Sequence, residues 1–154
     1  MPVGSTRAGG DMTSLGKAIF LGLILTLLSG CSSEQAPVGR WEGFLDSNDW
    51  IIGVRLQVED GNAIRATALS VDVTGASLPE RADNARAIKR ALPEQWKTAT
   101  RGNIDFRRNI LTRRGGNAPL FVYHPETGAM TFNFYARGKL TKRVKLRPVE
   151  NFTP

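Results

Sequence analysis

The chain has 154 residues, a formal net charge of +7 and 41% hydrophobic residues, which is the composition of a folded domain. Its single cysteine, Cys31, excludes an internal disulfide and any metal site built from several cysteines. Any domain must therefore be held together by packing alone.

The first thirty residues have the three parts of a secretory signal. Arg7 and Lys17 provide a basic start, the uncharged apolar run Ala18–Leu28 follows, and the small residues Ser29 and Gly30 end the segment. The run is about half of the roughly 20 apolar residues that a transmembrane helix needs. We therefore expect residues 1–30 to be a cleaved signal peptide.

The residues Leu28, Ser29, Gly30 and Cys31 resemble the lipobox of bacterial lipoproteins. The resemblance implies that Leu28, Ser29 and Gly30 direct cleavage before Cys31, and that Cys31 carries a diacylglycerol and an acyl chain such as palmitate. Two or three acyl chains give stable membrane attachment, whereas one is marginal. Ser32 lacks the Asp that commonly retains Gram-negative lipoproteins in the inner membrane, which implies the outer membrane, facing the periplasm. The alternatives are a transmembrane helix and an ordinary signal with a free thiol.

The segment 31–38 is polar and has no apolar period, so it is expected to be a tether between the lipid and the domain. Residues 39–150 are expected to form a single domain, and their number suffices for one hydrophobic core. The predicted fold class is mainly β (α+β). About seven mostly antiparallel strands would form a small barrel or a sandwich, with one helix around residues 78–92.

Three strands are expected before the helix. Gly39–Leu45 is the first, and Trp50–Val58 shows the period-2 alternation of a half-buried strand. Asp60–Asn62 is typical of a hairpin turn. In the third strand the apolar positions change parity between Ala68 and Leu69, so a bulge or strand bend is expected near Ala68.

The helix has a clear start signal. Ser77 and Glu80 have the spacing of a capping box, and Pro79 is tolerated in the first turn. Apolar residues then recur at helical spacing, namely Ala82, Ala85, Ile88 and Leu92. Pro93 is expected to end the helix, because proline cannot continue the hydrogen-bond ladder.

Four strands are expected after the helix, with Gly- and Pro-containing turns between them. They cover residues 103–107 with an extension to 111, then 120–123, 130–135 and 139–147. The short connections favour antiparallel pairing.

Gly39, Arg40 and Trp41, at the start of the first strand, are similar to the lipocalin signature, in which Gly-x-Trp opens the barrel. The resemblance implies a small-molecule carrier with an apolar pocket. It also implies that Trp41 closes the barrel floor and that an arginine of the last strand, Arg143 or Arg147, covers it. The alternative is that Trp41 is an ordinary core aromatic residue.

Positive charge is concentrated in the second half of the domain. Residues 101–147 contain 11 Lys and Arg against two acids, whereas residues 32–100 contain eight against ten. Arginine binds phosphate and carboxylate through its planar fork. The candidate anionic-ligand-binding residues are Arg107, Arg108, Arg113, Arg114, Arg137, Lys139, Lys142, Arg143, Lys145 and Arg147. The alternative is a solvated face, or edge strands protected from aggregation by charge.

The expected partners of these residues are anionic lipid, lipopolysaccharide or an acidic protein. Nucleic acid is not expected for an exported protein, although the aromatic residues Phe132, Phe134 and Tyr135 could stack on bases.

No catalytic motif is recognisable. The single histidine, His124, is followed by Pro125 and is explained by a turn, and Asp105 is the nearest candidate for a catalytic partner. We expect no catalytic residue, metal or cofactor. The predicted function is a lipid-anchored envelope protein acting as a non-enzymatic binding or structural accessory module. A lipocalin-like carrier is the alternative, and a hydrolase is less favoured.

Overall fold

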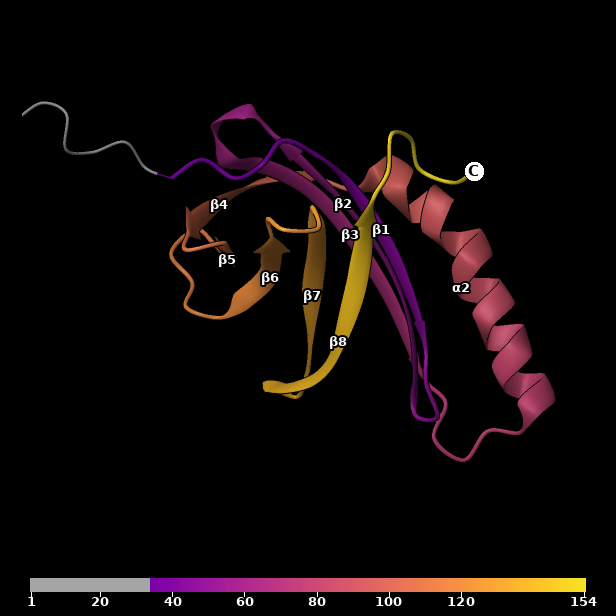
Figure 1. The fold of residues 1–154 in the computed structure, drawn as a ribbon. Helices are drawn as coiled ribbons and strands as arrows, with labels where there is room; N and C mark the ends of the chain where they lie inside the picture. The colour runs from indigo at the N-terminus through magenta and orange to yellow at the C-terminus, as the bar shows by residue number, and fades with distance from the viewer. Residues whose placement is uncertain (1–33) are drawn as a thin grey trace, which may run out of the picture. The chain divides into compact units, whose positions relative to one another are not determined.

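The computed structural model describes residues 34–154 (Figure 1). Its elements in chain order are β1 (Gly39–Asp46), β2 (Trp50–Glu59), the 3-10 turn η1 (Asp60–Asn62), β3 (Ala63–Asp72), α2 (Leu78–Thr98), β4 (Arg101–Arg107), β5 (Ile110–Arg113), β6 (Pro119–His124), β7 (Ala129–Ala136) and β8 (Lys139–Pro148). The predicted signal peptide and the lipobox with Cys31 lie outside the described residues. No helix within residues 34–154 is long and apolar enough to cross a bilayer.

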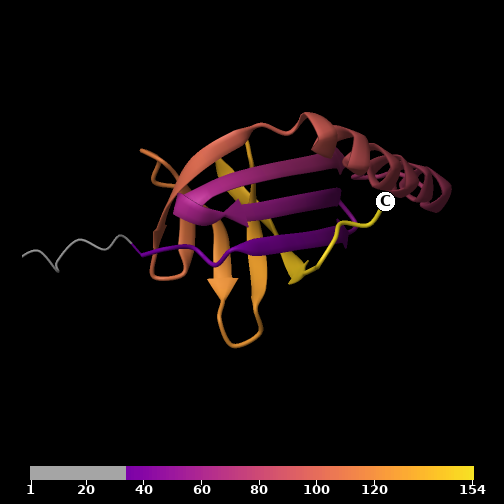
Figure 2. The same ribbon diagram turned by 90° about the horizontal axis from the view of Figure 1, so that it is seen from above.

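The eight strands form a closed antiparallel barrel in sequence order. The three long strands β1–β3 make one curved layer, and α2 lies along its outer side (Figures 1 and 2). Two narrow seams join this layer to β4–β8. Three residue pairs connect β3 to β4, at Ala63–Arg65, and two connect β1 to β8, at Trp41 and Glu42. The predicted mainly β barrel with one helix is confirmed.

The additional strand arises from a turn that the sequence analysis did not recognise. Arg108 and Asn109 both have positive φ angles, 50° and 64°, and they reverse the chain between β4 and β5. Residues 103–111 therefore form a hairpin and not one extended strand. Glycine usually occupies such positions, which is why Arg-Asn gave no clear turn signal.

Strand β2 is buried on both of its faces. Ile52, Val54 and Leu56 belong to the barrel core, while the alternating residues Gly53 and Arg55 lie on the outer face and are buried as well. A Cβ atom on Gly53 would lie only 2.9 Å from the Ile88 side chain of α2, so this glycine permits the close approach of the helix.

Of the two alternatives expected near Ala68, a bulge or a strand bend, the bulge is wrong. Strands β2 and β3 pair without interruption from Trp50–Asp72 to Glu59–Ala63. The change of parity has another cause. Ile64 packs against the barrel core, whereas Leu69 and Val71 have the opposite parity and lie on the outer side of β3, the side on which α2 packs. The apolar positions change face because the helix, and not the barrel interior, covers the second half of β3.

The predicted end of the helix at Pro93 is also wrong, because α2 continues through Pro93 to Thr98. The last turn is stabilised from the sheet. Arg65 on β3 donates hydrogen bonds to the Trp96 and Ala99 carbonyl oxygens at 2.6 and 2.9 Å, and its guanidinium lies 4.7 Å from the Trp96 ring centre. The predicted capping box of Ser77 and Glu80 is present.

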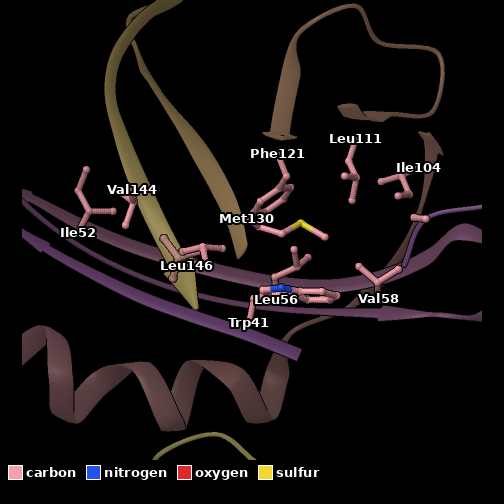
Figure 3. Close-up of a cluster of buried hydrophobic side chains, with 12 residues drawn as sticks. Trp41, Ile52, Leu56, Val58, Ile104, Leu111, Phe121, Met130, Val144 and Leu146 are labelled. Atoms are coloured by element: carbon pink, nitrogen blue, oxygen red, sulfur yellow. The ribbon is translucent and has the colours of Figure 1, made fainter. Parts of the chain in front are cut away.

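Side chains from both layers fill the barrel interior (Figure 3). The core lies on the side of β1–β3 opposite to α2. Its labelled members are Trp41, Ile52, Leu56, Val58, Ile104, Leu111, Phe121, Met130, Val144 and Leu146, each at most 5% exposed. Burial of this apolar surface is the main force that closes the barrel.

Trp41 is a core aromatic residue with a satisfied indole. Its Nε1 donates to the Gly128 carbonyl oxygen at 2.8 Å, and its ring meets Tyr123 edge-on. A Cβ atom on Gly39 would lie 2.9 Å from the Trp41 ring, which explains the glycine two residues earlier. Arg143 and Arg147 are exposed and have the parity opposite to the core residues Val144 and Leu146, so neither covers the indole.

The segment before β1 also packs on the barrel. Ala36 is 2% exposed, and its backbone N–H donates to Asn62 Oδ1 at 2.8 Å. Asn62 Nδ2 donates to the Glu34 carbonyl oxygen. Glu34 and Ala36, two residues of the expected tether, therefore contact η1.

Candidate functional site

The ten candidate basic residues belong to two separate hairpins. Arg107, Arg108, Arg113 and Arg114 lie on β4, β5 and their turns, and the other six lie on β7, β8 and the turn between them. Cross-strand pairing places Arg107 and Lys145 in one row, with Ile110, Val122 and Thr131 between them. Four strand spacings separate its ends by about 19 Å around the barrel wall, which places them on different sides of the closed barrel. The structure therefore does not bring all ten side chains to one site.

One of the ten is engaged within the domain. The Lys142 ammonium lies 2.7 Å from Asp49 Oδ1 in an ion pair. The hydrogen bonds from Lys142 and Ser47 lower the pKa of the Asp49 carboxyl. Lys142 therefore fixes the β1–β2 turn to β8, which is a structural role.

A groove of about 630 Å³ lies on the outer face of the barrel, where α2, β1, β8 and the segment after β8 meet. Its apolar lining is Gly43, Phe44 and Leu92, and its cations are Lys89, Lys145, Arg147 and Arg55. The remaining lining residues are Glu42, Thr153 and Pro154. This volume is in the range of small-molecule sites.

Three of these cations have no acidic partner in the part of the chain that the structure describes. Within residues 34–154, no carboxylate lies in ion-pair distance of Lys89, Lys145 or Arg147. The Lys89 ammonium lies 4.7 Å from the centre of the Phe44 ring. Lys145 and Arg147 are exposed on β8. The groove thus combines uncompensated positive charge with an apolar surface.

The acid of the groove, Glu42, is held by Arg55. The two side chains are 14% and 4% exposed, and Arg55 Nε lies 3.1 Å from Glu42 Oε1. Arg55 Nη2 also donates to the Thr153 carbonyl oxygen. Glu42 Oε2 accepts from the Thr153 hydroxyl and N–H at 3.0 and 3.3 Å. The pair is therefore satisfied by residues of its own chain, as a largely buried ion pair must be.

Sequence reasoning identified Lys145 and Arg147 but missed Lys89 and Arg55. Lys89 lies on the helix, outside the basic second half of the domain, and Arg55 lies in an alternating strand where its position suggested a solvent-facing residue. Only the packing of α2 against β2 shows that this outer face is buried.

A second hollow, of about 460 Å³, opens beside the seam between β3 and β4. Ile64, Ala66, Ile104 and Leu120 form its apolar lining, and Arg101, Arg113 and Arg114 are its cations. Arg101 is paired with Glu59 at 2.9 Å. We call this hollow the barrel mouth.

Asp105 and His124 are not brought together. The strand register offsets them by five residues along the sheet and two strands across it, about 19 Å measured over the sheet. His124 Nε2 lies 2.8 Å from Thr131 Oγ1, and Asp105 accepts a hydrogen bond from the Gly115 N–H. Within residues 34–154, no cluster of three His, Cys, Asp or Glu side chains is arranged to hold a metal ion.

Comparisons with protein-family models, curated proteins and solved structures find no match to this chain. The assignment of a function therefore depends on the chemistry of the groove and of the barrel mouth.

Proposed function

We propose that this chain is a lipid-anchored envelope protein of the outer membrane, facing the periplasm, whose barrel is a non-enzymatic binding module. The groove would contact an anionic envelope component or an acidic partner protein. One observation carries the proposal: Lys89, Lys145 and Arg147 surround an apolar floor and have no carboxylate partner among residues 34–154.

The mechanism is charge complementarity at a tethered surface. Uncompensated cations attract an anionic surface over several ångströms, and salt weakens this attraction. Acylation of Cys31 would keep the domain close to the bilayer and raise its effective concentration there. The apolar floor of Phe44 and Leu92 adds a contact that salt does not screen.

Vesicle binding tests the role of the groove. The chain from residue 31 onward would carry Cys31→Ser, so that no acyl chain contributes, and would be titrated with vesicles of phosphatidylglycerol and of phosphatidylcholine across a salt series. Reversing Lys89, Lys145 and Arg147 to Glu should weaken binding to phosphatidylglycerol at least about 100-fold, since each basic residue near an anionic membrane contributes about 1 kcal/mol.

The matched control reverses Arg107, Arg108 and Arg114 to Glu, which changes the net charge by the same amount on the other hairpin. We expect a smaller loss from this control. Equal losses in the two triple variants would show that net charge and not the groove drives binding. Affinity that does not depend on salt would also contradict the proposal.

The anchor needs a separate test. Mass analysis of the protein from membranes should show cleavage before Cys31 and a diacylglycerol on its sulfur, and Cys31→Ser should release the protein from the membrane. An unmodified thiol or an uncut leader would refute the anchored location.

A small-molecule carrier is the second candidate, with which the barrel fold is compatible. Because side chains fill the core, the ligand would occupy the barrel mouth and contact its apolar residues Ile64, Ala66, Ile104 and Leu120. Organic extraction of the purified protein followed by mass spectrometry should then recover a bound molecule. Ala66→Trp would fill the mouth and should abolish that recovery, whereas recovery at the original level would remove this candidate.

A further inference from the structure

We propose that Arg55 is an anion-binding residue, which the chain's own segment after β8, residues 149–154, masks. The groove then binds an amphiphile, which is an alkyl chain that carries an oxyanion such as a carboxylate or a phosphate monoester. This inference rests on the proposed function, because it names the ligand class of the same groove. It adds a residue that the general proposal does not use, and a competition between ligand and chain.

The first argument is the position of the Thr153 carbonyl oxygen. It accepts a hydrogen bond from Arg55 Nη2, on a guanidinium that is 4% exposed and borders the groove. Arg55 Nε is committed to Glu42 at 3.1 Å, so Nη2 can change partner while the ion pair persists. A ligand oxyanion would form a stronger, charge-assisted hydrogen bond there than a peptide carbonyl forms.

The second argument is that the masking segment is lightly held. Of residues 149–154, Phe152 is the one that packs as an aromatic anchor, with its ring 4.6 Å from Trp96 and 5.2 Å from the Arg55 guanidinium. Glu150, Asn151, Thr153 and Pro154 are all exposed. The remaining attachments are hydrogen bonds. Arg40 Nη1 donates to the Glu150 carbonyl oxygen at 2.7 Å, and the Thr153 hydroxyl and N–H donate to Glu42 Oε2 at 3.0 and 3.3 Å. Segments with so little buried apolar surface open locally at low cost.

The third argument concerns the shape of the ligand. When the segment leaves, Arg55 joins Lys145 and Arg147 around the groove, and Glu42 remains neutralised by its ion pair. These three cations then line the same groove, which suits a single oxyanion. Phe44, Gly43 and Leu92 form the apolar floor beside them, which suits an alkyl chain. Acidic peptides lack that chain and fit this floor less well.

Calorimetry with three soluble probes tests the proposal: octyl phosphate, inorganic phosphate and the neutral amphiphile octyl glucoside. We use the chain from residue 31 onward with Cys31→Ser. Octyl phosphate should bind at least about tenfold more tightly than either of the other two. Equal affinity for inorganic phosphate would show a simple anion site, and equal affinity for octyl glucoside a simple apolar surface. Either result would overturn the assignment of an amphiphile.

Phe152→Ala tests the mask and leaves all four groove cations in the chain, although it removes the ring that lies 5.2 Å from the Arg55 guanidinium. Removing the anchor shifts the segment toward its open state, so octyl phosphate should bind about three- to tenfold more tightly. Leu140→Ala, at an exposed position of β8 that does not line the groove, should leave the affinity unchanged. Unchanged or weaker binding by Phe152→Ala would overturn the masking role.

Arg55→Lys keeps the charge but loses the second edge of the guanidinium, so it should abolish the gain that Phe152→Ala produces. A gain that persists in the double variant would exclude Arg55 as the anion-binding residue. If octyl phosphate binding fails while the vesicle experiment succeeds, this inference falls and the general proposal stands. Failure of both experiments removes both.

Discussion

Substitution of Gly43 by alanine tests whether the barrel closes where β1 meets β8. A Cβ atom at this position would lie 2.5 Å from both the Lys145 carbonyl oxygen and the Leu146 Cδ2 atom. Ordinary contacts between carbon atoms are 3.5–4.0 Å, so β1 and β8 would have to move apart by about 1 Å. The Lys145 carbonyl belongs to the backbone of β8, which also pairs with β7, so it cannot yield as a flexible side chain would.

The expected cost is about 2–3 kcal/mol, the upper part of the range for overpacking, because the displaced atoms adjoin the two residue pairs that join β1 to β8. With a urea m-value of about 2 kcal/mol/M, the middle of the range for a small domain, the unfolding midpoint should fall by about 1–1.5 M. Urea unfolding followed by tryptophan fluorescence measures this shift, since Trp41 lies beside the site.

Gly102→Ala is the matched control. A Cβ atom on Gly102 has nothing within 4 Å and its φ angle is not in the left-handed region. Its free energy of unfolding should change by less than about 0.5 kcal/mol, or rise slightly because alanine restricts the unfolded chain. If Gly43→Ala were as stable as this control, the close approach of β1 and β8 would be wrong.

Three further substitutions probe the core, the helix and an ion pair. Leu56→Ala, at a position with 0% exposure, should lower the unfolding free energy by about 2–5 kcal/mol in urea titrations. Ser77→Ala removes the helix cap and should cost about 1 kcal/mol in the same assay, with a loss below 0.2 kcal/mol counting against the cap. Lys142 and Ser47 lower the pKa of Asp49 below its ordinary value of 3.8, so its carboxylate stabilises the fold above pH 3.8 and this contribution is lost as the pH falls further. Asp49→Asn should therefore flatten the decline in melting temperature between about pH 4 and 2, and an unchanged decline would refute the role of the pair.

Local sequence patterns predicted most of the fold because most elements carry local signals. The strand at Trp50–Val58 and the capping box at Ser77 carry local signals, and both are present, although β2 is buried on both faces and not half-buried as its alternation predicted. The errors occurred where a tertiary contact decides the structure. Arg65, thirty-one residues away from Trp96, stabilises the helix end beyond Pro93. The apolar residue Leu69 lies on the outer side of β3 because α2 covers that side.

The candidate site was predicted only in part, for the same reason. Charge counts identified Lys145 and Arg147 because their basic neighbours are close in sequence. Lys89 and Arg55 join them only after α2 packs on β2, and Thr153 reaches Glu42 across 111 residues. Conversely, a count of charges in the sequence could not distinguish Lys142, which is paired with Asp49, from the cations that have no acidic partner among residues 34–154.

The unequal lengths of the strand ladders have a consequence for amide exchange with solvent. Ten residue pairs hold β2 to β3, whereas the barrel is closed by three pairs at Ala63–Arg65 and two at Trp41 and Glu42. Opening the barrel between β3 and β4 or between β1 and β8 breaks few hydrogen bonds, while the hairpin of β2 and β3 stays intact. Deuterium should therefore enter the closing strands well before it enters β2, and a ligand that spans β1 and β8 should slow that entry most.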